Sequence, residues 1–243
     1  MGICVATQQS VVILGVGPGL GAAAARRFAA AGYAVAIAAR TAEKLDPIVA
    51  AISKGGGKAI AITADATNEA DVTELVARTE RDLGPLGVAI YNASGRVVKS
   101  VLDLTGAEVE EAWRRSCLGG FFLGREAAKR MVTRESGTIL FTGATSAMRG
   151  SANFAAFAIG KFGLRALSQS MARELGPKGI HVAHVNIDGP INTGAQAARL
   201  AAERAPDGLL EPEAIAESYY QLHMQHRSAW TQELDVRPWV EKF

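Results

Sequence analysis

The residues best placed to do chemistry form a glycine-rich stretch that follows an apolar run. Residues 11–14 are all apolar, and they are followed by Gly15, Gly17, Gly19, Leu20 and Gly21. Glycines at this spacing let a chain turn sharply, bring backbone amides close to a pyrophosphate and pack a helix tightly on a strand. The positive end of the helix dipole also favours a negative ligand. The stretch predicts a strand, a phosphate-binding turn and a helix N-terminus.

The elements that must position this turn alternate along the chain, as they do in repeated βαβ units. We expect strands at 10–14, 33–39, 58–62, 87–91, 137–142, 181–187 and 231–236. We expect helices at 19–31, 42–53, 69–83, 106–134, 152–175 and 213–226, with a capping box at Thr105 and Glu108. The pattern predicts one α/β domain over residues 1–243, a Rossmann-type, doubly wound, mostly parallel seven-stranded sheet with helices on both faces.

Composition excludes several classes of partner. With 243 residues, 49% of them hydrophobic, the chain can bury a sizeable core. Its 26 basic and 24 acidic residues leave a formal charge of +2, which gives no basic surface for nucleic acid or an anionic membrane. No apolar run approaches the roughly 18 residues of a membrane span. Cys4 and Cys117 form no disulfide or metal framework, and residues 1–10 lack a signal peptide, so we expect a cytoplasmic protein.

The spacing of Gly15, Gly19 and Gly21 resembles the cofactor turn of the short-chain dehydrogenase/reductase family. Further landmarks follow in the order and spacing of that family, from about residue 10 to residue 193. They are Asp65, the run 92–95, Lys161 and the run 187–193. The resemblance implies a nicotinamide cofactor and hydride transfer. It also implies an adenine pocket at Asp65 and Ala66, an adenosine ribose site at Asn92 and Ala93, and a carboxamide site at Ile191 and Thr193.

Arg40 and Thr41 end the second expected strand, where an acidic residue would bind the adenosine 2′-hydroxyl of NAD. A guanidinium donates two parallel hydrogen bonds to a phosphate, and the Thr41 hydroxyl could add another. These residues favour NADP over NAD. A solvated arginine at a strand end is the alternative.

The catalytic positions of the family carry other residues here. The Tyr-x-x-x-Lys pair appears as Phe157 and Lys161, and a phenyl ring has no exchangeable proton. The serine position is Ala144, the asparagine position of the fourth helix is Cys117, and the tyrosine position of related enoyl reductases is Phe154. Lys161 alone remains, and its side chain can donate to the nicotinamide ribose hydroxyls.

Other groups could replace the lost acid. Thr145 and Ser146 directly follow the missing serine, although an unactivated alcohol is a poor proton donor near neutral pH. Asp188 is expected near the nicotinamide and is a candidate acid if burial favours its protonated form. An aspartate that caps a loop is the alternative. The candidate catalytic residues are therefore Lys161, Thr145, Ser146 and Asp188.

No metal site is expected. His181 and His184 lie on opposite faces of a strand by alternation. His223 and His226 could share a ligand, yet they lack carboxylate or cysteine companions. Cys117 is either a redox thiol or a small buried residue of an apolar helix.

The C-terminal part of the chain is expected to cover the cleft and to contact other subunits. Residues 194–226 are placed over the active site as a substrate lid, whose Leu200, Leu209 and Leu210 either contact a hydrophobic ligand or pack in the core. The tail 229–243 carries aromatic side chains that must be buried on the body or on a neighbour, namely Trp230, Trp239 and Phe243. Family members are commonly dimers or tetramers, so the resemblance implies a homo-oligomer.

Two functions fit the sequence. The first is an NADP-dependent oxidoreductase that transfers a hydride to or from a small carbonyl, alcohol or activated alkene substrate. The second is a catalytically inactive, nucleotide-binding homologue with a regulatory or binding role, because a fold does not by itself confer a reaction.

Overall fold

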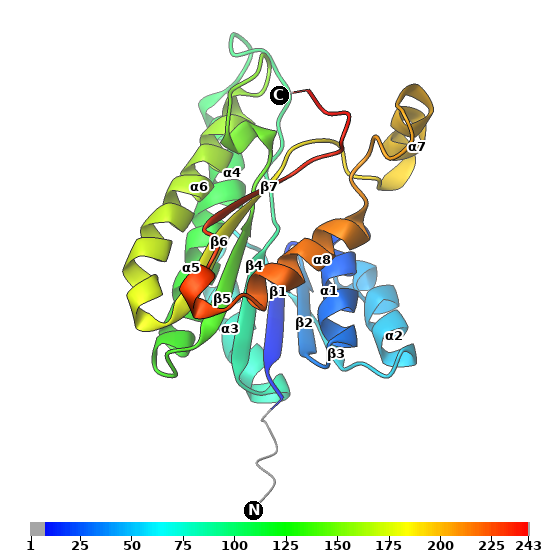
Figure 1. Cartoon of the computed structure of the whole chain (residues 1–243). Coiled ribbons are helices and arrows are strands. Elements are labelled where there is room, and N and C mark those ends of the chain that lie inside the picture. Colours follow the sequence, from blue (N-terminus) through cyan, green and yellow to red (C-terminus); the bar gives the residue numbers. More distant parts are fainter. Residues whose placement is uncertain (1–7, 243) are drawn as a thin grey trace, which may run out of the picture.

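Seven short apolar segments form one parallel sheet in the computed structural model, which describes residues 8–242 apart from the side chains of residues 42, 195 and 196 (Figure 1). The strands are β1 (Ser10–Leu14), β2 (Ala34–Ala39), β3 (Ala59–Thr63), β4 (Leu86–Tyr91), β5 (Gly137–Thr142), β6 (Ile180–Ile187) and β7 (Glu233–Val236). Their order in the sheet is β3-β2-β1-β4-β5-β6-β7, and every neighbouring pair is parallel. The predicted Rossmann-type sheet is confirmed, with its change of winding direction between β1 and β4.

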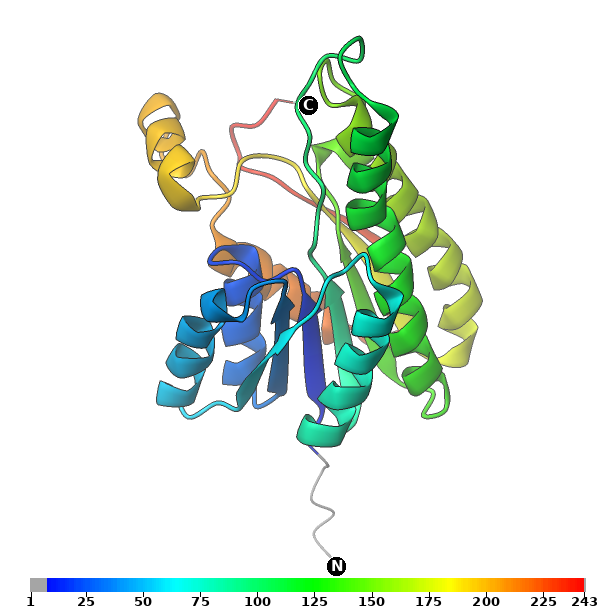
Figure 2. The same ribbon diagram turned by 180° about the vertical axis from the view of Figure 1, so that it is seen from behind.

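Helices cover both faces of the sheet, as predicted. One face carries α1 (Leu20–Ala30), α2 (Asp46–Lys54) and α8 (Pro212–His223), and the other carries α3 (Glu69–Leu83), α5 (Gly119–Val132) and α6 (Ala155–Leu175) (Figures 1 and 2). The central strands are buried on both sides, which is why β1 and β4 read as nearly continuous apolar runs. A further helix, α7 (Gly194–Glu203), stands above the carboxyl ends of the strands within the segment predicted as a lid (Figure 1).

The prediction of a single helix at 106–134 is wrong. The structure has α4 (Gly106–Trp113), one wide π turn at Arg114–Leu118, and then α5. The hydroxyl of the buried Tyr91 donates to the Arg115 carbonyl, which is thereby taken out of the regular helical pattern. A Cβ atom on Gly119 would lie 2.5 Å from the Ala66 carbonyl oxygen, so the helix also packs closely against the loop that follows β3. The capping box of Thr105 and Glu108 at the start of α4 is confirmed.

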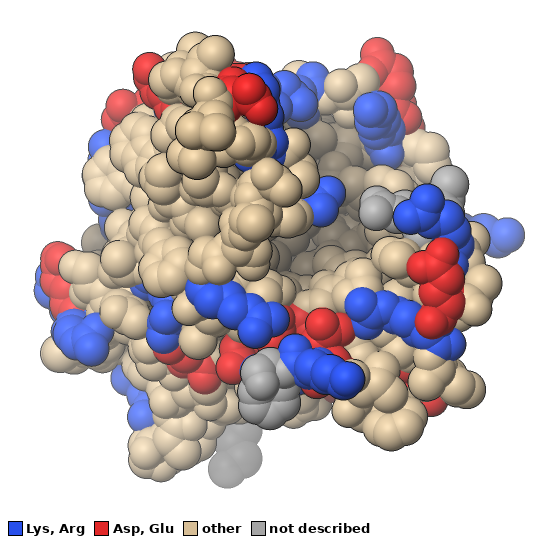
Figure 3. All heavy atoms as spheres, turned by 90° about the horizontal axis from the view of Figure 1, so that it is seen from above, with Lys and Arg blue, Asp and Glu red and all other residues tan. Residues whose placement is uncertain are grey.

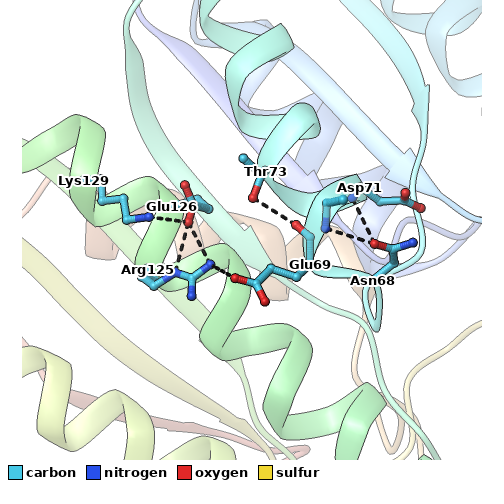
Figure 4. Close-up of polar contacts among 8 residues, drawn as sticks. Asn68, Glu69, Asp71, Thr73, Arg125, Glu126 and Lys129 are labelled. Atoms are coloured by element: carbon cyan, nitrogen blue, oxygen red, sulfur yellow. Dashed lines mark hydrogen bonds and ion pairs between the residues drawn. The ribbon is translucent and has the colours of Figure 1, made fainter.

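Polar contacts tie α3 to α5 on one face of the sheet (Figure 4). The Asn68 side chain caps the start of α3 by accepting from two backbone amides. Arg125 on α5 donates to Glu69 at the start of α3 and also to Glu126. Glu126 is 5% exposed and accepts from Lys129 as well, so its buried charge is compensated by two cations.

No helix of the described residues is long and apolar enough to cross a membrane.

Candidate active site

A cleft of about 820 Å³ opens at the carboxyl ends of the strands, beside the point where the winding of the sheet reverses. Seen from above, the surface is hollowed there, and lysine and arginine side chains stand around the hollow (Figure 3). The cleft brings together many residues that the sequence singled out, namely Gly15, Gly17, Gly19, Leu20, Gly21, Asn92, Thr145, Ser146, Lys161, Ile191 and Thr193. Ligands of open α/β sheets bind at this position.

The glycine turn touches the end of β4. Gly15 has a φ of +96°, and a Cβ atom there would lie 2.3 Å from the amide nitrogen of Ala93. Asn92 Nδ2 donates to the Gly15 carbonyl at 2.8 Å and fixes the same approach from the side. A Cβ on Gly21 would lie 2.8 Å from Val16 Cα, so α1 starts close against the strand. Glycine is required at both positions, for conformation at the first and for space at the second.

The N-terminus of α1 faces the cleft without a protein cap. No described side chain caps the helix at Gly19, and its first turn holds no acidic residue. A Cβ on Gly19 would lie 2.5 Å from Cγ2 of Thr193, so this backbone is packed from one side and bordered by the cleft on the other. Amides at an uncapped helix start bind phosphate. The turn therefore fits the pyrophosphate of a dinucleotide.

Of the residues predicted for the adenosine end, Asn92 lines the cleft. The others lie outside its lining, namely Arg40, Thr41, Asp65, Ala66 and Ala93. The amides of Gly15 and Val16 both donate to the Ala38 carbonyl, so Arg40 leaves β2 beside the glycine turn.

The Arg40 guanidinium is exposed, and no hydrogen bond or ion pair holds it among the described residues. Burial alone would raise the pKa of Asp65, but two hydrogen bonds from Thr67 and the charges of Arg40 and Arg115 outweigh it and lower that pKa. Arg40 is thus close enough to Asp65 to act on it and is still free to bind an anion.

Lys161 lies at the floor of the cleft. Its residue is 2% exposed, and Nζ donates to the Thr142 carbonyl at 2.7 Å. Burial lowers the pKa of the Lys161 ammonium to about 8. The ring centroid of Phe157 lies 5.8 Å from Nζ. Ala144, Phe154 and Phe157 all line the cleft, so the departures from the family pattern face the ligand space.

The structure separates the other candidate acids. The Thr145 hydroxyl donates to Asp188 Oδ1 at 2.7 Å, so its proton is directed away from a ligand. Arg237 Nε lies 3.6 Å from Asp188 Oδ2, and Asp188 is not part of the cleft lining. These contacts contradict the expectation of a proton donor at Asp188 and favour its structural alternative, because here it is the acceptor. Ser146, which is 6% exposed, does line the cleft.

The histidines serve separate structural contacts. His181 stacks on Trp230 with ring centroids 4.9 Å apart, and its Nε2 bonds to the Thr231 carbonyl. His223 bridges the Tyr33 and Thr138 hydroxyls at 2.7 and 2.8 Å.

His226 instead caps a short turn by accepting from the Ser228 amide. Within the described part of the chain, no group of three or more His, Cys, Asp and Glu side chains could hold a metal ion. Burial raises the pKa of the Cys117 thiol, which opposes the redox alternative. Cys4 lies outside the described residues.

The cleft also contains residues that sequence reasoning missed. The Arg96 guanidinium lies over the Phe154 ring, 5.4 Å from its centroid, and both residues line the cleft. Glu241 in the C-terminal tail pairs with Arg204 at 2.8 Å, and this pair borders the cleft as well. Arg96 could have been suspected from its place just after the run 92–95, whereas no sequence pattern marks Glu241.

The segment predicted as a lid contributes Leu200 to the cleft lining. Leu209 and Leu210 are buried and lie outside that lining, so they follow the packing alternative. In the tail, Trp239 is 74% exposed, which contradicts the expected burial on this subunit. Phe243 lies outside the described residues.

The family model for short chain dehydrogenases matches residues 9–204 of this chain. The chain belongs to the short-chain dehydrogenase/reductase family. A short-chain dehydrogenase/reductase of Armillaria gallica is 32% identical over 212 residues, which cover 86% of this chain and 81% of the relative. The crystal structure of a short-chain dehydrogenase from Rhodopseudomonas palustris aligns with a TM-score of 0.84 at 42% identity, over 95% of this chain and 99% of that one.

A metagenomic short-chain oxidoreductase in complex with NADP aligns with a TM-score of 0.82 at 25% identity, over 95% of this chain and 97% of that one. The short-chain dehydrogenase/reductase fold therefore extends over nearly the whole chain, including the cleft.

Proposed function

We propose that the protein is an NADP-dependent oxidoreductase that transfers a hydride to or from a small carbonyl, alcohol or activated alkene substrate. The observation that carries the proposal is the glycine turn, whose close packing at Gly15 and Gly21 leaves an uncapped helix start facing the cleft. When bound, the reduced nicotinamide supplies the hydride. The NADP-bound relative supports the same choice of cofactor.

Separate groups of residues in this chain bind the parts of the cofactor. The amides at the start of α1 bind the pyrophosphate, and the exposed Arg40 guanidinium binds the 2′-phosphate with help from Thr41. Asp65, Ala66, Asn92 and Ala93 border the adenosine, while Ile191 and Thr193 hold the carboxamide.

Two side chains are left to act at the substrate end. Lys161 donates to the ribose hydroxyls and holds a proton at Nζ, and Ser146 offers a hydroxyl to the substrate oxygen. Residues 194–226 act as a lid through α7, whose Ala197 and Leu200 line the cleft.

The proposal is tested by NADPH binding and turnover. Binding is measured by the change in NADPH fluorescence, with NADH as the comparison, and turnover by NADPH oxidation with ketones, quinones and enones. Tighter binding of NADPH than NADH, with turnover of one substrate class, supports the proposal.

A catalytically inactive, nucleotide-binding protein is the second candidate. It is favoured by Ala144 and Phe157, which place a methyl group and a phenyl ring where the family carries its hydroxyls. Tight binding of NADPH without turnover of any class would favour this candidate.

We also propose a cytoplasmic homo-oligomer, a dimer or a tetramer. Large apolar side chains on α4, α5 and α6 are exposed by 36–50%, namely Trp113, Phe121, Ile159 and Phe162. Burying such a surface against a second copy is favourable. Light scattering during gel filtration tests this, and Phe162→Glu should shift the protein toward the monomer.

A further inference from the structure

One arginine of the cleft has no acidic partner. The described residues that line the cleft include two arginines, Arg96 and Arg204. Arg204 is paired with Glu241 at 2.8 Å, and Glu241 is the only acidic residue of the described lining. The Arg96 guanidinium makes no hydrogen bond or ion pair with any described residue. Its positive charge is therefore available to a ligand in the cleft.

The backbone that carries Arg96 is fixed on both sides. A Cβ atom on the preceding Gly95 would lie 2.7 Å from the backbone of α4, and the Gly95 amide donates to Ser116 Oγ at 3.0 Å. Further along the chain, the Lys99 amide donates to the Asn153 carbonyl at 2.8 Å. Arg96 therefore extends from a fixed position between α4 and the segment that precedes α6.

The Phe154 ring orients the Arg96 side chain. The guanidinium carbon lies over this ring, 5.4 Å from its centroid. Contact with an aromatic face uses the flat side of a guanidinium and leaves the N–H donors at its edge free. A carboxylate accepts two of these donors in parallel. Because the aromatic contact already orders the side chain, less conformational entropy is lost when an anion binds.

Hydroxyl groups from the same two segments accompany this cation. Ser94 lies just before Gly95, and Ser151 accepts from the Phe154 amide through its backbone carbonyl at 3.1 Å. Both serines line the cleft, and neither hydroxyl has a hydrogen-bond partner among the described residues. Each hydroxyl can donate one hydrogen bond to an anion. One guanidinium with two hydroxyls matches the single charge of a carboxylate better than the double charge of a phosphate.

Arg96 lies away from the turn that fits the pyrophosphate. The glycine turn leads into α1 on one face of the sheet, whereas Arg96 lies beside α4 and the start of α6, on the other face. Phe154 directly precedes α6 and is followed one helical turn later by Phe157, whose ring centroid lies 5.8 Å from Lys161 Nζ. The unpaired cation therefore faces the substrate end of the cleft.

We propose that the substrate is a carboxylic acid whose carboxylate is bound by Arg96, which thereby selects acids over their neutral analogues. This inference rests on the proposed function for the hydride transfer at the reacting group of the same substrate. The apolar part of the substrate lies along Phe154, Phe157 and Leu200, which line the same cleft. Residues one helical turn apart have Cβ atoms about 5–6 Å from each other, so several bonds separate the carboxylate from the reacting group. An oxo acid, a hydroxy acid or an unsaturated acid of this shape is the expected class.

The first test measures binding without turnover. The acid 3-phenylpropanoate, its neutral amide and phenyl phosphate are each titrated into the protein by calorimetry, with excess NADP+ to occupy the cofactor site. We expect the acid to bind at least about tenfold more tightly than the amide, as for one charge-assisted pair at a partly exposed site. Phenyl phosphate should bind no more tightly than the acid. Acid binding that is undetectable or equal to that of the amide overturns the inference, and so does tighter binding of phenyl phosphate.

Variants assign the preference to one side chain. Arg96→Gln should remove it, and Arg96→Lys should keep only part of it, because an ammonium lacks the fixed pair of parallel donors. Arg149→Gln is the matched control, since Arg149 is also exposed and unpaired among the described residues but lies outside the cleft lining. It removes the same charge and should leave the preference intact. Equal losses in Arg96→Gln and Arg149→Gln would show a general attraction by the positive surface and overturn the inference.

The second test compares turnover of a matched pair. NADPH oxidation is followed with 4-oxo-4-phenylbutanoate and with its methyl ester. We expect kcat/KM to be at least about tenfold higher for the acid, and Arg96→Gln should lower this value to that of the ester. Equal kcat/KM values for the acid and the ester overturn the inference but leave the proposed function standing. Failure to bind NADPH overturns the proposed function, and the calorimetric titration, repeated without NADP+, still decides whether Arg96 binds a carboxylate.

Discussion

Replacing Gly15 by alanine should damage the protein far more than the same change at Gly17, although the two glycines line the same cleft. At Gly15 the backbone has a φ of +96°, which costs an L-residue about 1–2 kcal/mol. The new Cβ would also lie 2.3 Å from Ala93 N and 2.5 Å from Ala93 Cα. Relief of such an overlap requires a backbone shift, which typically costs about 1–3 kcal/mol. We expect Gly15→Ala to lower the free energy of unfolding by about 2–5 kcal/mol.

Gly17 supplies the control. No described atom lies within 4 Å of a Cβ built there, and its φ is not in the left-handed region. Gly17→Ala should change the free energy of unfolding by less than about 0.5 kcal/mol. Gly19→Ala should separate folding from binding, because the atoms nearest to its Cβ belong to the side chain of Thr193, which can rotate.

Equilibrium urea unfolding, followed by circular dichroism, measures the three variants against the wild-type protein, and NADPH fluorescence measures binding. Gly15→Ala should also weaken NADPH binding, since a displaced turn no longer holds the amides at the start of α1 toward the cleft. A Gly15→Ala protein as stable as Gly17→Ala would refute the geometry that we assign to this turn.

Three other predictions follow from the site and the core. Arg40→Asp should weaken the binding of NADPH by about 1–3 kcal/mol and the binding of NADH far less, as measured by fluorescence titration. Equal losses of binding for both cofactors would show that Arg40 does not contact the 2′-phosphate. Burial lowers the pKa of His184 and of His223 from 6.5 to about 4, so the unfolded chain binds more protons than the folded chain between these values. The free energy of unfolding should therefore fall as the pH drops from 7 to 5, by about 2 kcal/mol for each histidine. Urea unfolding at both pH values should show a loss smaller by this amount in His184→Leu. The double variant Ala144→Ser with Phe157→Tyr restores a serine and a phenol beside Lys161, so it should reduce cyclohexanone faster than the wild-type protein does. A folded, NADPH-binding double variant that stays inactive on cyclohexanone would count against that assignment.

The sequence by itself determined the sheet and the glycine turn. Strands such as β1 and β4 are almost entirely apolar because both of their faces are buried, and this pattern is local in the chain. The roles of Gly15 and Gly21 could also be predicted from the sequence, because the need for a positive φ or for close packing is a property of a single position. The spacing between Phe157 and Lys161 is enough to show that phenylalanine occupies the family's tyrosine position.

Only the tertiary structure decided which polar groups face the ligand space. Thr145 and Ser146 are equivalent in the sequence and both line the cleft, yet only the Thr145 hydroxyl donates to Asp188, 43 residues away. The path of the tail decided that Glu241 meets Arg204 at the cleft. The π turn of the fourth helical segment depends on the Tyr91 hydroxyl, which belongs to a neighbouring strand. Such contacts join distant segments, and they form only once the packing of the sheet and its helices sets the distance between them.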